Sequence, residues 1–109
     1  MSRITARDAV AKAARGEITL IDVRDARELA ASGKAAPALH IPLATLPMRA
    51  NPKSPDFNAG IAQGKPVAVY CAVGGRAGMA AQLLAQLGYD AHNIGGFGDW
   101  VQAGGAVSR

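Results

Sequence analysis

The residues best suited to chemistry are a cysteine and an arginine with two glycines between them. Cys71, the only cysteine of the chain, follows a short apolar run at 67–70. After Ala72 and Val73 come Gly74 and Gly75, followed directly by Arg76. Glycines allow a loop to curl so that its N–H groups point inward and bind an anion. The pattern is therefore typical of a nucleophilic thiolate that acts on a small anionic substrate.

The flanking segments place this loop between a strand and a helix. Residues 67–70 are apolar and mostly β-branched, and Pro66 marks the start of the strand. The apolar residues of 77–87 recur at the spacing of one helix face, and Gly88 follows as a stop. The first N–H groups of a helix lack intrahelical partners and carry partial positive charge. They would therefore stabilise a thiolate at Cys71.

A buried structural cysteine is the alternative interpretation, since free cysteine is among the most buried residue types. Two glycines and an arginine within five residues of the cysteine contribute little to packing and much to anion binding, so the sequence favours a reactive thiol. An exposed single thiol fits a reducing compartment, and we therefore expect a cytoplasmic location.

Length and composition limit the classes of protein to consider. The 109 residues fit one domain, and 12 Lys and Arg against 8 Asp and Glu give a net charge of +4, which mildly favours anionic partners. The basic residues are scattered, so no nucleic-acid partner is expected. No apolar run could span a bilayer, and the N-terminus lacks a hydrophobic signal core, so neither a membrane nor export is expected. One cysteine excludes an intramolecular disulfide and a cysteine-cluster metal site.

The remaining sequence alternates between predicted helices and strands. We expect helices at 6–14, 25–32, 77–87 and 97–102, brief helical turns at 43–48 and 56–62, and strands at 18–23, 40–42, 67–70 and 90–94. Ser2 or Thr5 is expected to cap the first helix. A tight turn is predicted at 95–96 and a frayed tail from Gly104. Strands that alternate with helices form a parallel sheet covered on both faces. Ligands of such sheets bind beyond the carboxyl ends of the strands, which is where Cys71 falls.

Three ionisable residues outside the loop are interpreted as structural. Asp22 interrupts an apolar strand and must be paired or hydrogen-bonded once buried, with Arg24 and Arg27 as candidate partners. His40 fits a hydrogen-bonded structural histidine better than a catalytic base. His92 lies in a polar turn, and the two histidines have no metal-ligand spacing with the cysteine.

Four motifs in order resemble those of the single-domain rhodaneses, a sulfurtransferase family. They are Leu20-Ile21-Asp22-Val23-Arg24 with Glu28, His40-Ile41-Pro42, the segment from Tyr70 to Gly78, and Gly95-Gly96-Phe97 with Trp100. The resemblance implies a single rhodanese domain over 1–109, with its core at about 5–104. It also implies a three-layer α/β fold, in which a mostly parallel five-stranded sheet lies between helices.

The resemblance further implies an activity. Cys71 would take a sulfane sulfur from thiosulfate or another persulfide donor, become a persulfide, and pass the sulfur to cyanide or a thiol. The residues that would bind the substrate and the persulfide are Ala72, Val73, Gly74, Gly75, Arg76 and Ala77. Their N–H groups would act as an oxyanion hole with sulfur in place of oxygen, and Arg76 would orient the incoming anion. No metal or organic cofactor is implied, and no particular oligomeric state.

Several positions depart from the family pattern. Leu39 and Leu43 stand where glycines usually flank the His-Ile-Pro motif, Leu29 where an aromatic is usual, and Ala77 where a serine is common. The loop also offers no second cation. These departures make efficient use of free thiosulfate less certain and leave room for a protein-bound persulfide donor.

Other functions are compatible with a loop of this kind. A phosphatase or arsenate reductase of the related fold has five residues between its cysteine and arginine, whereas four separate Cys71 from Arg76. The tighter loop suits one sulfur atom, and it contains no Asp to serve as general acid. A non-catalytic or sensory persulfide-binding module would keep both residues. A redox thiol protein would need a resolving cysteine, which this sequence lacks.

Overall fold

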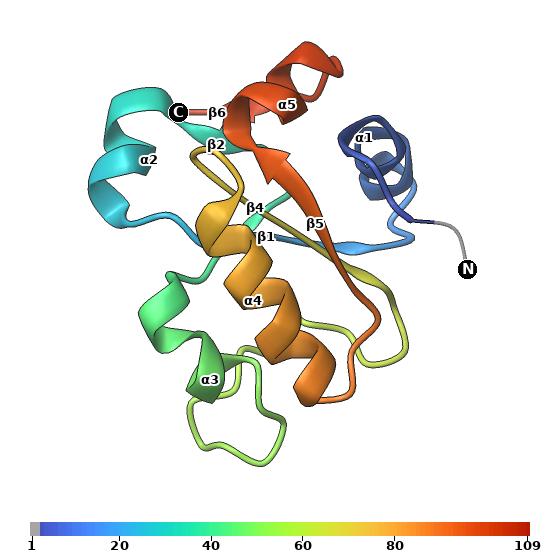
Figure 1. The fold of residues 1–109 in the computed structure, drawn as a ribbon, viewed down its shortest axis with the longest axis vertical. Helices are drawn as coiled ribbons and strands as arrows, with labels where there is room; N and C mark the ends of the chain where they lie inside the picture. The colour runs from blue at the N-terminus through green and yellow to red at the C-terminus, as the bar shows by residue number, and fades with distance from the viewer. Residues whose placement is uncertain (1–2) are drawn as a thin grey trace.

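Four parallel strands form the central sheet of the computed structural model, which describes residues 3–109 (Figure 1). In spatial order they are β3 (Leu39–His40), β1 (Thr19–Asp22), β4 (Val67–Cys71) and β5 (Ala91–Gly96). β4 lies inside the sheet, paired in parallel with β1 and β5, and all of its residues are buried. Because β4 is apolar and β-branched, it suits this interior position, and its carboxyl end carries the cysteine.

Helices cover both faces of the sheet. One face packs against α4 (Gly75–Gln86), α3 (Leu46–Arg49) and the neighbouring 3-10 turn η1 (Leu43–Thr45). The other face packs against α1 (Ala6–Ala14) and α5 (Phe97–Gln102). Alternate residues of β4 enter the two cores, so that Cys71 belongs to the α4 side and Tyr70 to the α1 and α5 side. This confirms the predicted three-layer α/β fold. Among residues 3–109, no helix is long and apolar enough to cross a membrane.

The strand arrangement differs from the expectation of a five-stranded sheet. The described residues form a four-stranded parallel sheet and a separate antiparallel pair, β2 (Lys34–Ala35) with β6 (Val107–Ser108). The predicted frayed tail is therefore wrong. Gly105 lies against the Trp100 ring, and the indole N–H of Trp100 donates to the Ala106 carbonyl at 2.9 Å, which leads the chain into β6.

Two further local predictions were wrong. Residues 95–96 do not form a turn between elements but end β5, where Gly96 is the partner of Cys71 across an irregular register. Residues 56–62 contain turns rather than a helix, with the Asn58 side chain accepting from the Gly60 N–H at 2.8 Å. Such a local side-chain bond competes with helix formation.

The helix starts follow their capping residues. Thr5 and Asp8 form a capping box at α1, as predicted for Thr5, whereas the other proposed cap, Ser2, lies outside the described residues. Asp25 caps α2 (Ala26–Ser32) in the same way with Glu28. α4 begins two residues earlier than predicted, since Gly74 has a φ of 106° and turns the chain directly into the helix.

A buried network of charged and polar side chains joins these elements. Asp22, which is fully buried, accepts from the Arg24 guanidinium at 2.7 Å and from the Tyr70 hydroxyl at 2.6 Å. Arg24 also donates to the Gly33 carbonyl at 2.6 Å, and its guanidinium lies 4.5 Å from the centre of the Phe97 ring. The predicted structural role of Asp22 is confirmed, and Arg24 is its partner.

Arg24→Met should lower the free energy of unfolding by about 3–5 kcal/mol, since it leaves the Asp22 carboxylate buried without its cation. Urea denaturation measures the effect. Arg27→Met is the matched control, because Arg27 is exposed on α2 and should change stability by less than about 0.5 kcal/mol. Equal losses in the two variants would contradict this account of the network.

Candidate functional site

The Cys71 thiol sits at the carboxyl end of β4, under the loop that leads into α4. The Gly74 N–H donates to Sγ at 2.9 Å, and the Ala77 N–H points to it at 3.4 Å. The expectation of an exposed thiol is wrong, because Cys71 lies in the core with 1% of its surface exposed. Its surroundings are nevertheless not those of an inert packed thiol. Two backbone donors and the start of a 12-residue helix converge on the sulfur, and all of them favour negative charge there.

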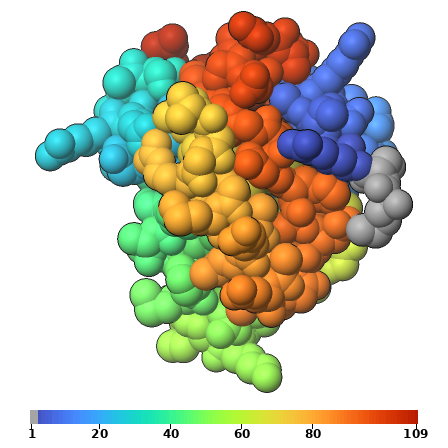
Figure 2. Space-filling view, in the orientation of Figure 1, coloured from blue at the N-terminus to red at the C-terminus, as the bar shows by residue number. Residues whose placement is uncertain are grey.

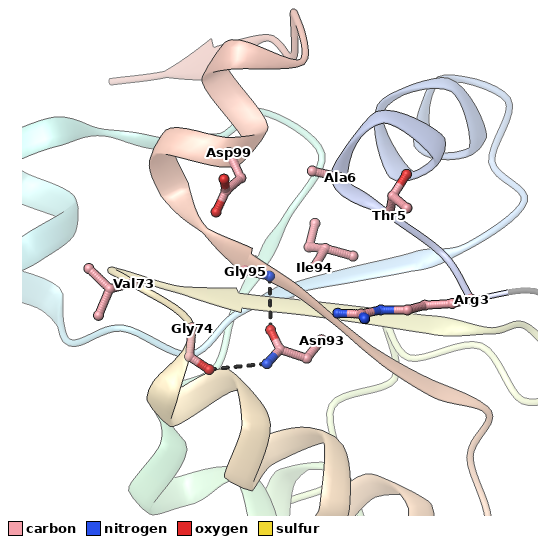
Figure 3. A pocket seen from close by; sticks show the side chains of 9 residues that line it. All are labelled: Arg3, Thr5, Ala6, Val73, Gly74, Asn93, Ile94, Gly95 and Asp99. Atoms are coloured by element: carbon pink, nitrogen blue, oxygen red, sulfur yellow. Dashed lines mark hydrogen bonds between the residues drawn. The ribbon is translucent and has the colours of Figure 1, made fainter.

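A side chain and a glycine of β5 hold the loop in this shape (Figure 3). The Asn93 side chain donates to the Gly74 carbonyl at 3.1 Å and accepts from the Gly95 N–H at 2.8 Å. A Cβ atom on Gly96 would overlap the Ala72 carbonyl oxygen, so only glycine allows the loop to approach the strand this closely. Asn93 could not be identified from the sequence, because an amide side chain that holds a loop has no signature beyond its place two residues before a pair of glycines.

The six residues predicted to bind substrate have different environments. Ala72, Val73 and Gly75 are exposed, with Val73 at 90% of its full surface, whereas Ala77 is buried. In the space-filling view the loop (yellow) lies between α2 (cyan) and the end of β5 (orange-red) (Figure 2). The structure thus brings two N–H groups of the predicted set onto Sγ and leaves the tip of the loop facing solvent.

Arg76 is bound to a carboxylate of a different helix. Its Nη1 and Nη2 donate to Oε1 and Oε2 of Glu28 at 2.7 and 2.8 Å, a bidentate pair that joins α4 to α2. The Asp25 N–H also donates to Oε1 of Glu28, at 3.0 Å. The hydrogen bonds from Arg76 lower the pKa of Glu28 from 4.5 to about 2, and Glu28 raises the pKa of Arg76. Both groups are charged at neutral pH, so the predicted anion-binding cation already has a partner.

The two histidines have structural roles, as predicted. Nε2 of His40 donates to the Arg24 carbonyl at 2.7 Å, which links β3 to the end of β1. His92 accepts from the Ile4 N–H at 3.3 Å through Nδ1 and bonds Asp90 at 2.8 Å through Nε2. Neither hydrogen-bonds to the thiol.

An open groove of about 520 Å³ runs along the outer side of the loop (Figure 3). Its lining includes Arg3, Thr5, Val73, Asn93, Gly95 and Asp99. The groove borders β5 and α1, whereas the Cys71 side chain belongs to the core on the α4 side of the sheet. The groove therefore lies beside the loop and does not lead to the thiol.

Fold and site together define a class: an α/β protein in which an interior parallel strand delivers a single thiol to a tight loop lined by N–H groups. A family model described as the rhodanese-like domain matches residues 5–103, and the chain belongs to this family. No curated protein sequence matches it.

Solved structures support the same assignment. A Rhodopseudomonas palustris protein of unknown function, described as a possible tyrosine phosphatase, is 31% identical with a TM-score of 0.84, and the match covers 99% of this chain and 85% of that one. A rhodanese-related protein from Thermoplasma volcanium is 28% identical, with a TM-score of 0.76 and coverage of 99% and 98%. The human single-domain sulfurtransferase TSTD1 is 29% identical, with a TM-score of 0.74 and coverage of 94% and 96%.

Gly96→Ala should destabilise the protein by about 1–3 kcal/mol, because the new methyl group would displace the Ala72 carbonyl and the loop with it. Urea denaturation measures the loss. Gly98→Ala, two residues further on, is the matched control, since a methyl group there meets open space. A Gly96→Ala protein as stable as the control would show that the close approach of loop and strand does not constrain this position.

The Glu28–Arg76 pair should show in the pH dependence of stability. Because the folded-state pKa of Glu28 lies below its ordinary value of 4.5, its stabilisation is fully present above pH 4.5 and is lost as pH falls toward about 2. The stability difference between wild type and Glu28→Gln should therefore be constant from about pH 5 to 8 and smaller at about pH 3. Urea titrations at these pH values measure it, and a difference unchanged at pH 3 would contradict the pairing.

Proposed function

We propose that this protein is a sulfurtransferase in which Cys71 carries sulfane sulfur as a persulfide. The observation that carries the proposal is the pair of N–H groups, from Gly74 and Ala77, directed at Sγ. A loop with two donors and no carboxylate stabilises a negatively charged sulfur without supplying a proton. That is what a thiolate nucleophile and a persulfide both require.

The reaction has two displacement steps at sulfur. In the first, the Cys71 thiolate attacks the outer sulfur of the donor, and the donor's S–S bond breaks. The leaving group, which is sulfite from thiosulfate or a thiolate from a persulfide, departs with the electron pair. In the second, cyanide or a thiolate attacks the outer sulfur of the Cys71 persulfide, the new S–S bond breaks, and the thiolate is regenerated. The sulfur moves as a neutral sulfane atom in both steps, so neither step needs an external oxidant or reductant.

The burial of Cys71 supports a substrate that reaches the site with a narrow end. A thiol with 1% of its surface exposed can meet a terminal sulfur atom more readily than a bulky centre. We propose a small anionic sulfur donor or a protein-bound persulfide as the source of sulfur. A lone thiol also supports a reducing compartment, and we propose the cytoplasm.

A phosphatase is the second candidate, because the Rhodopseudomonas palustris structure is described as a possible tyrosine phosphatase. Two observations weigh against it. Four residues separate Cys71 from Arg76, and the Arg76 guanidinium is held by Glu28, so fewer groups are free to surround a tetrahedral oxyanion.

A sensory persulfide-binding module would share the geometry of the loop but would transfer sulfur slowly.

Intact mass spectrometry after incubation with thiosulfate tests the proposal. The wild type should gain the mass of one sulfur atom, and cyanide should remove it as thiocyanate. Cys71→Ser should show neither the gain in mass nor thiocyanate formation, because its hydroxyl is a far weaker nucleophile than a thiolate.

Two outcomes would contradict sulfur transfer. Hydrolysis of an aryl phosphate with no change in mass would favour the phosphatase. A stoichiometric gain of sulfur that cyanide and thiols discharge only over hours would favour the sensory module.

A further inference from the structure

We propose that Glu28 determines which sulfur donor the loop accepts: by holding and neutralising Arg76, it disfavours dianionic thiosulfate and favours persulfides of lower charge. This inference rests on the proposed sulfur transfer and names the substrate class of that site. Glu28 does not touch the sulfur. It acts through Arg76, as a positioning residue.

The geometry of the pair is fixed at both ends. Both terminal nitrogens of Arg76 bind the two carboxylate oxygens of Glu28, at 2.7 and 2.8 Å. Glu28 is held in turn by its own helix, because it forms a capping box with Asp25 at the start of α2. A bidentate pair that is anchored in this way is more ordered than an ordinary surface ion pair. The carboxylate of Glu28 therefore neutralises the charge of Arg76 as a fixed feature of the site.

Arg76 is the one charged residue of the loop at 72–77. A second cation, Arg3, lines the groove beside the loop on the α1 and β5 side of the sheet, whereas Cys71 belongs to the core on the α4 side. Residues 72–75 are uncharged, and Asp25, next to Glu28, adds a second carboxylate to the field at Arg76. The buried guanidinium of Arg24 is paired with Asp22. A donor that approaches Cys71 from the α4 side therefore meets N–H dipoles and an arginine that is already paired with a carboxylate. Thiosulfate carries two negative charges at neutral pH and a simple alkyl persulfide at most one, so the dianion gains least from this site.

Glu28→Gln tests the proposal, because the amide keeps the shape of the side chain and removes its charge. The rate of Cys71 persulfide formation is followed by intact mass as a function of donor concentration, with thiosulfate and with the persulfide of 2-mercaptoethanol. For thiosulfate, the half-saturating concentration should fall about tenfold while the maximal rate stays within about twofold. For the alkyl persulfide, it should change by less than about threefold.

Two further variants define the cause. Glu17→Gln removes the same charge near the start of β1, at the opposite edge of the parallel sheet, and should leave both donors unaffected. Adding Arg76→Gln to Glu28→Gln should abolish the gain with thiosulfate, since the freed cation is its source. If Glu28→Gln fails to fold, Glu28→Asp, whose shorter carboxylate cannot hold Arg76 as closely, should still lower the half-saturating concentration of thiosulfate by about threefold.

The outcomes separate the two proposals. If neither donor adds sulfur to the wild type or to any variant, both the sulfur transfer and the selectivity are wrong. If sulfur is transferred but Glu28→Gln leaves the ratio of the two half-saturating concentrations unchanged, only the role of Glu28 is wrong. An equal improvement in Glu17→Gln would also overturn it, since the effect would then follow the net charge of the molecule.

Discussion

The buried ion pair between Asp22 and Arg24 is the interaction on which the carboxyl edge of the sheet depends. A carboxylate without solvent is stable only when its oxygens are all engaged, and here Arg24 and Tyr70 supply the donors. Arg24 also binds two neighbouring elements. Its guanidinium donates to the Ser32 hydroxyl at the end of α2, and its backbone carbonyl accepts from the His40 side chain of β3. These two residues thus link the end of β1 to β3, β4 and the end of α2.

The thiol's environment follows from this frame and is built mainly from backbone. Strand β4 brings Cys71 to the edge, and the left-handed Gly74 turns the chain so that N–H groups face Sγ. Gly96 and Asn93 on β5 hold the loop from the other side. Since backbone groups do this work, the exposed side chains at the tip, such as Val73, are free to differ without altering how the sulfur is held.

The sequence predicted those features that depend on neighbouring residues. The helices, the buried β4 and the position of Cys71 follow from periodicity and from glycine placement within a few residues. The partner of Arg76 could not be found this way, because Glu28 lies 48 residues earlier and reaches it only when α2 and α4 adopt their places. The pairing of the tail with β2 was not predicted, for the same reason. The glycines at 104–105 indicated a loose end, whereas contact with Trp100 and pairing with β2 order the tail.

The structure separates two tasks that the sequence had assigned together to the loop. Stabilising charge on sulfur falls to N–H groups, which are fixed by the fold and independent of side chains. Attracting a donor falls to the charge near the loop, which depends on a contact between two helices. In our proposal the second task rests on one carboxylate, Glu28, which pairs with Arg76 and makes no hydrogen bond to the thiol. On this proposal, the groups that hold the sulfur and the charge that selects the donor can change independently of each other, because the first are backbone N–H groups and the second is a single side chain.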